Sequence, residues 1–292
     1  MHPRLKVKLV VDTEADFYYL VPSPHFTALD RIKWRLNKLR GKLYRYPQPS
    51  RQGILNLIGA SKATKVPLSL CLVGHLYLST CQGHPHSTEQ APKHPWYTPT
   101  RKNWYAWDNG GNYRTHPGRY FGDIVEKEKQ NKLLTWGLHA FTHEALTLES
   151  PKVIHSIIQA GMHAAKQAGI TPTEFAAPFE LTEDTHDTQK VYNALRTAGI
   201  TRVYYAGQDT GLTIKRSFTI TQPQKEKGLE KIRISRYFEG TSSQRELRAI
   251  CADILANKDT NATYCLVTHD FTHKNQKNAL FLFNFLKKYH FL

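Results

Sequence analysis

The sequence predicts an α/β fold, because short apolar runs of strand length alternate along the chain with amphipathic segments of helix length. A strand followed by a helix recurs roughly six or seven times, and polar residues repeatedly follow the strands. No repeat of fixed period and no low-complexity linker divides the 292 residues. We therefore expect one domain over 1–292, with its functional face at the carboxyl ends of parallel strands.

The first half of the chain predicts two strands and two helical segments. The β-branched apolar run Val7–Val11 predicts the first strand, which ends at Asp12. A helix is expected over 30–43, where apolar residues recur on one face, and a shorter helical segment over 53–59. The run over 66–77 predicts the second strand.

The segment from Cys81 to Gly118 interrupts this alternation and is expected to be a long loop insertion. Loops of this length within a compact domain usually serve a function. The aromatic residues of this insertion could stack on a sugar or a base, or they could simply anchor the loop to the domain. They include Trp96, Tyr97, Trp104, Tyr105 and Trp107.

The second half of the chain alternates more regularly. Gly169 and Gly199 follow two amphipathic segments and predict the ends of two helices. In chain order, we expect helix 120–131, strand 132–138, helix 151–168, strand 170–177, helix 187–198, strands 202–206 and 232–237, helix 244–257, strand 263–268 and helix 275–290.

Composition limits the classes of protein to be considered. The formal net charge of +16 would attract polyanions or an acidic substrate, but the basic residues are spread along the chain, which is also typical of a general solvated surface. No specific nucleic-acid partner is expected. No apolar run approaches the ~20 residues of a membrane span, and the N-terminus lacks the pattern of a cleaved signal. We therefore expect a cytoplasmic protein.

The cysteines indicate neither a disulfide framework nor a cysteine-based zinc site. There are four of them, and no two are spaced as a CxxC pair. Cys71 and Cys265 lie in apolar strand-like runs, where a free cysteine behaves as a small hydrophobic residue.

Two histidines, His139 and His143, follow a predicted strand at a spacing of four. If this segment is helical or tightly turned, both imidazoles can reach one metal ion. The chain has 15 histidines, so such a pair can also arise without a metal. Exposed or hydrogen-bonded histidines are therefore the alternative interpretation.

Three carboxylates crowd the end of the first predicted strand. Asp12 and Glu14 alternate onto the same face. Buried like charges are costly unless a cation or a proton compensates them, and a metal ion would do so. Either Glu14 or Asp16 could supply the metal carboxylate, and Asp16 could instead cap the next segment.

Two further segments carry polar groups that catalysis could use. The predicted strand 263–268 ends in His269 and Asp270, and a histidine beside a carboxylate can act as a general acid or base, although a surface histidine after a strand is common. The turn at Pro178 and Phe179 could direct backbone N–H groups at an oxyanion, although by itself it is only a turn.

The order of these segments is more specific than any one of them. An Asp-x-Glu strand end is followed by an apolar strand ending in Val-Gly, then His-x-x-x-His, Phe-x-x-Pro and Leu-x-x-His. This succession, from residue 7 to residue 270, resembles the NodB-homology polysaccharide deacetylases. The resemblance implies a deformed (β/α)7 barrel with one divalent metal ion, usually zinc, held by Glu14, His139 and His143.

The resemblance also implies the remaining roles. Asp12 matches the catalytic base, and His269 matches the general acid that protonates the leaving amine. The backbone near Pro178 and Phe179 would help to hold the tetrahedral oxyanion. These roles together describe hydrolysis of an amide.

The chain departs from the family pattern at three places. Family members usually have Asp-Asp where this chain has Asp-Thr-Glu. Their Phe-Arg-x-Pro motif supplies an arginine that orients the base, whereas Ala176–Ala177 occupies that stretch here. Arg233 or Arg236 is a hypothetical replacement, and Tyr237–Phe238 is a hypothetical counterpart of a further motif that usually carries Asp and Trp.

The leading hypothesis is a metal-dependent hydrolase that removes an acyl group from an N-acylated sugar or a related small amide. The net charge favours an anionic substrate. One alternative is a non-catalytic barrel that binds carbohydrate or nucleic acid, and another is a cyclic-amide hydrolase on the same fold. A binding protein has no need to keep the acidic residues and histidines together, which favours an enzyme.

Overall fold

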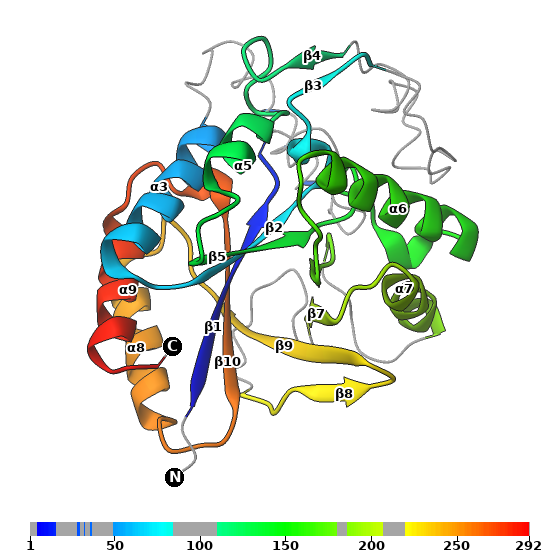
Figure 1. Ribbon diagram of the computed structural model, residues 1–292. Helices are drawn as coiled ribbons and strands as arrows, with labels where there is room; N and C mark the ends of the chain where they lie inside the picture. Colours follow the sequence, from blue (N-terminus) through cyan, green and yellow to red (C-terminus); the bar gives the residue numbers. More distant parts are fainter. Residues whose placement is uncertain are drawn as a thin grey trace.

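The computed structural model describes residues 5–15, 49–83, 110–179, 186–206 and 220–291, together with isolated positions between 28 and 36. Seven parallel strands form a closed barrel, in the order β10-β1-β2-β5-β6-β7-β9 with β9 returning to β10 (Figure 1). Their bounds are Lys6–Thr13 (β1), Leu68–Leu72 (β2), Leu134–Leu138 (β5), Glu174–Ala176 (β6), Arg202–Tyr205 (β7), Leu229–Tyr237 (β9) and Thr263–His269 (β10). This architecture confirms the predicted (β/α)7 barrel.

Six helices of the described part cover the barrel. Figure 1 shows α3, α8 and α9 along one side and α6 and α7 along the other. Their bounds are Pro49–Thr64 (α3), Gly122–Glu128 (α5), Pro151–Gln167 (α6), His186–Thr197 (α7), Gln244–Ala256 (α8) and Lys277–Lys288 (α9). Short 3-10 helices follow three strands, at Gly74–Tyr77 (η1), Leu146–Leu148 (η2) and Asp270–Thr272 (η3). No helix among the described residues is both long enough and apolar enough to cross a membrane.

Two predicted strands are shorter than expected. The strand predicted over 66–77 ends at Leu72, because the chain then turns into η1 and its Gly74 amide donates to the carbonyl of Ala140. The strand predicted over 170–177 is reduced to Glu174–Ala176. Pro172 cannot donate to a strand ladder, so pairing starts only beyond it.

A hairpin strand was missed. β8 (Gln224–Glu226) pairs antiparallel with β9. Lys227 and Gly228 join the two strands, and both have positive φ, which suits a tight hairpin turn.

The helix predicted over 30–43 lies outside the described residues except at Ile32 and Leu36.

The long insertion is described only at its base. There, β3 (Thr80–Cys81) pairs antiparallel with β4 (Gly111–Asn112). Residues 84–109, which include all five aromatic residues singled out above, lie outside the described part of the chain. Both interpretations of these aromatic residues, stacking on a sugar or a base and anchoring the loop to the domain, stay predictions.

A charged network closes the amino end of the barrel. Glu174 accepts from the ammonium of Lys8 at 3.1 Å, from the hydroxyl of Tyr204 at 2.7 Å and from the guanidinium of Arg202, which also pairs with Glu230. Burial alone would raise the pKa of Glu174, but Lys8 and the surrounding donors outweigh it and lower the pKa. The catalytic candidates all lie at the other end of the barrel.

Candidate metal centre

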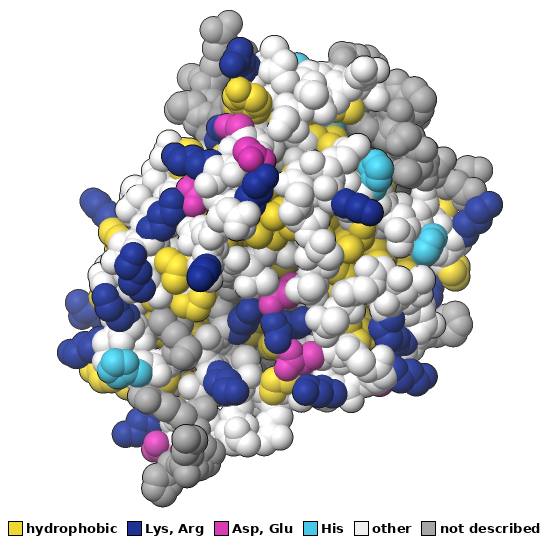
Figure 2. Space-filling view, in the orientation of Figure 1, with side chains coloured by type: hydrophobic (Ala, Val, Ile, Leu, Met, Phe, Trp, Pro, Cys, Tyr) yellow, Lys and Arg dark blue, Asp and Glu magenta, His cyan; other side chains and the backbone are white. Residues whose placement is uncertain are grey.

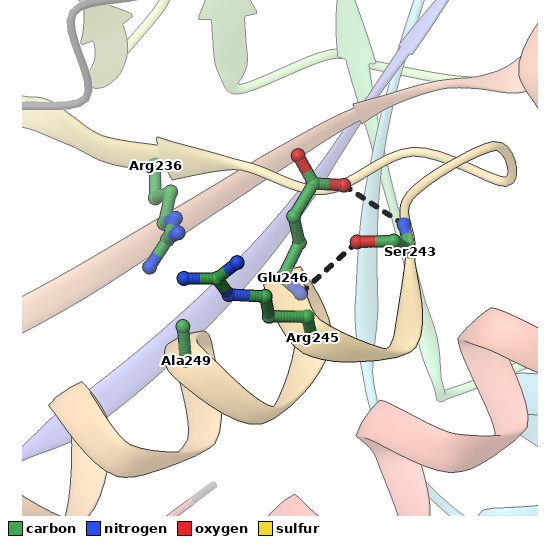
Figure 3. Close-up of a pocket in the computed structure, with 5 residues that line it drawn as sticks. All are labelled: Arg236, Ser243, Arg245, Glu246 and Ala249. Carbon is green, nitrogen blue, oxygen red and sulfur yellow. Dashed lines mark hydrogen bonds between the residues drawn. The ribbon is translucent and has the colours of Figure 1, made fainter.

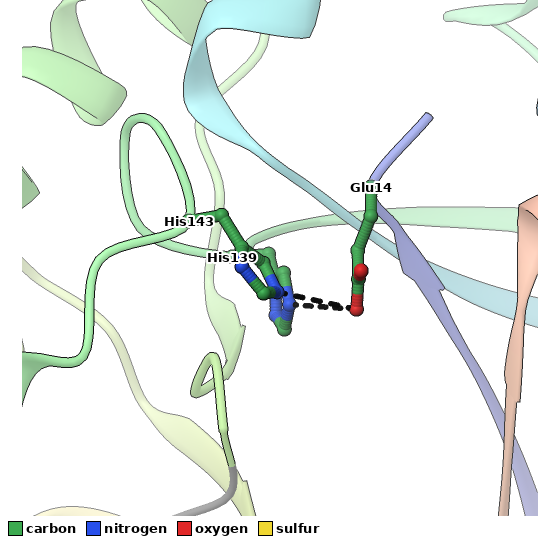
Figure 4. A group of neighbouring side chains, drawn as sticks. All are labelled: Glu14, His139 and His143. Carbon is green, nitrogen blue, oxygen red and sulfur yellow. Dashed lines mark ion pairs between the residues drawn. The ribbon is translucent and has the colours of Figure 1, made fainter. Parts of the chain in front are cut away.

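The strand ends bring three of the predicted residues to one point. Glu14 follows β1, His139 follows β5, and His143 ends the turn after β5 (Figure 4). Oε1 of Glu14 lies 3.6 Å from Nε2 of His139 and 3.3 Å from Nε2 of His143. All three side chains are buried, and their ligand atoms lie within 4.8 Å of one another.

The segment that carries the two histidines is a tight turn rather than a helix. Ala140 and His143 both adopt positive φ, at 55° and 68°. The backbone of η1 supports this turn, because the Gly74 amide donates to the carbonyl of Ala140 at 2.8 Å. The His75 amide donates in the same way to the carbonyl of Phe141 at 2.9 Å.

Glu144 stabilises the same turn through hydrogen bonds to its own carboxylate. Its buried carboxylate accepts hydrogen bonds from the amides of Phe141 (3.0 Å) and Thr142 (2.8 Å) and from the Thr142 hydroxyl. The turn between His139 and His143 is therefore held by side-chain and backbone contacts together. The role of Glu144 was missed by the sequence analysis, although an acid next to the second histidine was a visible signal.

Asp270 holds the other half of the centre. Its Oδ1 accepts hydrogen bonds from the amides of Glu14 (3.0 Å) and Ala15 (3.2 Å). Ala15 has a φ of 50°, so this clamp stabilises a left-handed residue directly after the acidic ligand candidate. Burial, with Glu14 nearby, raises the pKa of Asp270 to about 7, although its two amide donors act in the opposite direction.

Strained backbone gathers at this centre. Among the described residues other than glycine, seven have positive φ, and four of them surround the site: Ala15, Ala140, His143 and Phe179. Each such conformation costs about 1 kcal/mol or more and persists only where its surroundings enforce it. This clustering is typical of a functional site.

Asp12 lies on β1 two residues before Glu14, on the same face and further into the barrel. It follows Val10 on the inward face of β1, and the β1–β10 register pairs it with His269. Its side chain is buried, and Oδ1 has no hydrogen-bond partner among the described residues. Burial raises the pKa of Asp12 although His139 and His269 act in the opposite direction.

His269 reaches the centre from β10. Its Nε2 lies 3.6 Å from Oε1 of Glu14, and its Nδ1 lies 2.7 Å from Oε1 of Glu239. The ring stacks on Tyr237 at a centroid distance of 5.8 Å and an angle of 8°. Burial alone would lower the pKa of His269, but Glu239 outweighs it and raises the pKa well above its usual range. Sequence reasoning stopped at Tyr237–Phe238 and missed Glu239, the next residue.

Comparisons with known proteins identify the fold. The sequence matches no protein-family model and no curated protein. The structure is similar to a candidate polysaccharide deacetylase from Mycobacterium smegmatis, with 17% identity, a TM-score of 0.58 and coverage of 99% of this chain and 84% of that one. The chain has the NodB-type polysaccharide deacetylase fold.

Two further similar structures were found. A family 4 carbohydrate esterase from Streptomyces lividans is 11% identical, with a TM-score of 0.47 and coverage of 98% of this chain and 88% of that one. A 4-alpha-glucanotransferase from Thermococcus litoralis is 11% identical, with a TM-score of 0.50, and 98% of this chain corresponds to 37% of it. A fold does not determine a reaction, so the reaction must be argued from the site.

The residues present fit the divalent ion that the deacetylase fold implies. Among the described residues, Oε2 of Glu14, Nε2 of His139 and Nδ1 of His143 are buried and have no hydrogen-bond partner. One carboxylate and two imidazoles form a common zinc donor set. Nδ1 of His139 lies 2.8 Å from the carbonyl of Ala176, which fixes the ring and leaves Nε2 directed at Glu14.

The charges at the centre are strongly coupled. Burial alone would raise the pKa of Glu14, but His143 and His139 outweigh it and hold the pKa well below its usual range. Burial alone would lower the pKa of His139, but Asp12 and Glu14 outweigh it and raise the pKa. A cation at this point would take over the compensation that the imidazoles supply. Asp16, the alternative acidic ligand, lies outside the described residues.

Neither hypothetical replacement for the missing arginine faces Asp12. Arg236 pairs with Asp253 of α8 at 2.8 Å, on the outer side of the barrel. Ile232 and Ile234 belong to the inner apolar cluster, so strand alternation directs Arg233 outward between them. Neither of these two arginines can therefore take the base-orienting role that the resemblance implies.

The predicted oxyanion turn lies beside the centre. Phe179 has a φ of 57°, and its ring packs edge-on against His143 at a centroid distance of 4.6 Å. Pro178 precedes it in the same turn after β6. The turn thus contacts His143, one of the three candidate metal ligands. That its N–H groups stabilise an oxyanion stays a prediction.

A surface hollow elsewhere offers no comparable chemistry. It is lined by Arg236, Ser243, Arg245, Glu246 and Ala249 at the start of α8 (Figure 3). Ser243 and Glu246 are engaged in a capping box at that helix end, where each side chain accepts from the backbone amide of the other. The hollow therefore lacks the grouping of acidic residues and histidines found at the barrel mouth.

Proposed function

We propose that this chain, as one domain over 1–292, is a divalent-metal-dependent hydrolase that removes an acyl group from an N-acylated sugar or a related small amide. One observation carries the proposal. The donor set of Glu14, His139 and His143 meets at a single barrel mouth with two groups suited to proton transfer, Asp12 and His269.

Each residue has a distinct role in this proposal. Glu14, His139 and His143 would hold the metal ion, for which zinc is the first choice because the donor set is one carboxylate and two imidazoles. A bound divalent ion would supply Lewis-acid polarisation of the scissile carbonyl and increase the acidity of water. Asp12, buried and without a hydrogen-bond partner on Oδ1 among the described residues, would accept the proton of the attacking water.

His269 would protonate the leaving nitrogen. Its Nε2 faces the centre, while Glu239 binds the opposite ring nitrogen and raises the pKa of the ring. Glu239 therefore favours the charged form of the imidazole, which can donate a proton. Backbone N–H groups of the turn at Pro178 and Phe179 would stabilise the oxyanion.

The surroundings of the centre support a sugar as the acyl carrier. The rings of Tyr237 and Phe271 flank His269, at centroid distances of 5.8 and 5.3 Å, and Phe179 flanks His143. Partly exposed aromatic rings at a site mouth offer flat apolar faces on which a sugar ring can stack.

The basic surface supports an anionic form of that substrate. Figure 2 shows Lys and Arg side chains over much of the visible face, many of them along the side where Figure 1 places α3, α8 and α9. Such a field concentrates anionic substrates and weakens at high ionic strength. We expect kcat/KM to fall as salt rises, and an unchanged value would remove the argument for an anionic substrate.

Metal content tests the proposed function first. Elemental analysis of the purified chain should find about one divalent ion per molecule, and His139→Ala/His143→Ala should lose it. His155→Ala/His163→Ala is a matched control, because both of these histidines are exposed on α6. Acetate release from N-acetylated sugars should follow the metal content.

The alternatives make different predictions in the same experiment. A chain that binds no metal even when zinc is supplied would contradict the hydrolase and favour a non-catalytic carbohydrate- or nucleic-acid-binding barrel. Metal binding with ring opening of cyclic amides, and no acetate release from N-acetylated sugars, would favour a cyclic-amide hydrolase.

A further inference from the structure

The carboxylate of Glu239 is the meeting point of several donors behind His269. Oε1 binds Nδ1 of His269 at 2.7 Å. Oε2 accepts from the Thr272 hydroxyl at 2.7 Å, from the His269 amide at 3.2 Å and from the Thr268 hydroxyl at 3.3 Å. A carboxylate that accepts this many hydrogen bonds is held in one orientation.

The Thr268 hydroxyl links this carboxylate to a second histidine. Its Oγ1 lies 2.7 Å from Nε2 of His273. An ionised carboxylate can only accept a hydrogen bond, so the Thr268 hydroxyl donates its single hydrogen bond to Oε2 of Glu239. It then accepts from His273, which requires the neutral tautomer with the proton on Nε2.

The surroundings of His273 enforce a neutral ring in one position. Its side chain is fully buried and packs edge-on against Phe238 at a centroid distance of 5.7 Å. Its backbone is held at both ends, because its amide donates to the carbonyl of Asp270 and its carbonyl accepts from the side chain of Asn56 on α3. Burial lowers the pKa of His273 to about 4, which leaves the ring uncharged near neutral pH.

We propose that His273 is a positioning residue for the general acid: its Nε2–H orients the Thr268 hydroxyl toward Glu239, and Glu239 in turn orients His269. The role assigned to His269 rests on the proposed function, whereas the hydrogen-bond direction does not. The hydrogen-bonded series His273–Thr268–Glu239–His269 runs from the layer between the barrel and its helices, where Phe238 contacts both His273 and Phe283 of α9, to the site mouth. Through Asn56 it connects α3 to the proton donor.

A variant series separates orientation from simple packing. A glutamine side chain can place an N–H donor near the position of Nε2, whereas asparagine is too short and phenylalanine has no donor. With metal content unchanged, we expect His273→Gln to keep kcat, and His273→Asn and His273→Phe to lower kcat about tenfold with little change in KM. Thr268→Ser should behave as wild type and Thr268→Val as His273→Phe.

Coupling between the two positions gives a second criterion. If His273 acts only through Thr268, the double variant Thr268→Val/His273→Phe should be no slower than Thr268→Val alone. Additive losses, or equal kcat in the Gln, Asn and Phe variants at position 273, would overturn the proposal.

A spectroscopic measurement does not depend on activity. In protein with 15N-labelled histidine, the two ring nitrogens of His273 should report a neutral ring protonated on Nε2, assigned by the loss of these signals in His273→Gln. A ring protonated on Nδ1, or a charged ring, would overturn the proposal whether or not the chain is an enzyme. An inactive wild type with the expected tautomer would contradict the proposed function alone.

Discussion

The carboxylate of Asp270 accepts a hydrogen bond from the backbone amide of Glu14 at 3.0 Å, across 256 positions of the sequence. The same oxygen accepts from the next amide, so the strand end that carries the acidic ligand candidate is tied to the end of β10. Hydrogen bonds that hold the backbone of a metal-ligand candidate in place set how well a metal site is preorganised.

Loss of the Asp270 clamp should weaken metal binding. In Asp270→Ala, the amides of Glu14 and Ala15 lose their acceptor, and we expect zinc affinity to fall about 10–100-fold. Competition with a chelator of known affinity measures this change. Asp270→Asn keeps one carbonyl oxygen and should lie between wild type and Asp270→Ala. Equal affinity in all three proteins would show that the clamp is not needed.

Loss of the Glu144 carboxylate should also lower the affinity for zinc. In Glu144→Gln, the side chain brings an amide group toward the Phe141 and Thr142 donors, so the turn between His139 and His143 should loosen. We expect zinc affinity to fall about tenfold. Glu149→Gln is the matched control, because Glu149 is a second buried acid after the same strand. A similar loss in both variants would indicate a general effect of charge.

Stability should depend on pH through Glu174 at the amino end of the barrel. Its pKa is lowered in the folded protein from an ordinary value of 4.5, so it stabilises the fold above that pH, and the effect is lost as pH falls through the folded pKa. Glu174→Gln should lower the free energy of unfolding at pH 7 by about 2 kcal/mol, because Lys8 loses its ion pair and Arg202 keeps only its pair with Glu230.

The comparison of denaturation curves at several pH values checks this prediction. The difference between wild type and Glu174→Gln should shrink as pH falls below about 4.5. Glu226→Gln is the control, since Glu226 pairs with Lys231 at a more exposed position and should change stability little. A difference that does not change with pH would contradict the assignment.

Gly74 marks a close approach that tolerates no side chain. A Cβ at this position would lie 2.6 Å from Cα of Gly161 on α6 and 3.1 Å from the carbonyl oxygen of Ala140. We expect Gly74→Ala to lower stability by about 2 kcal/mol and to disturb the histidine turn, because the Gly74 amide supports it. Gly228→Asn, at a hairpin turn with open space around it, should change stability little. Thermal unfolding with and without zinc measures both effects.

The resemblance read from the ordered motifs predicted the barrel, and the structure confirms it. The buried strand at β1 and the polar residues after β1, β5 and β10 are local features, so the apolar runs alone indicated them. The predicted ends of strands were less accurate, and β8 was missed, where the alternation of apolar and polar residues is weak. β8 has the polar sequence Gln-Lys-Glu and forms only because β9 lies beside it.

The sequence by itself determined which residue types stand at the strand ends, because hydrophobic periodicity and the positions of acids and histidines are written along the chain. Only the closed barrel brings Glu14 to His139 and His143, and only there do Asp270 and Glu239 orient groups from distant parts of the chain. The physical reason is that hydrogen bonds and ion pairs act over about 3 Å in space, and only tertiary packing brings residues so distant in sequence to that separation.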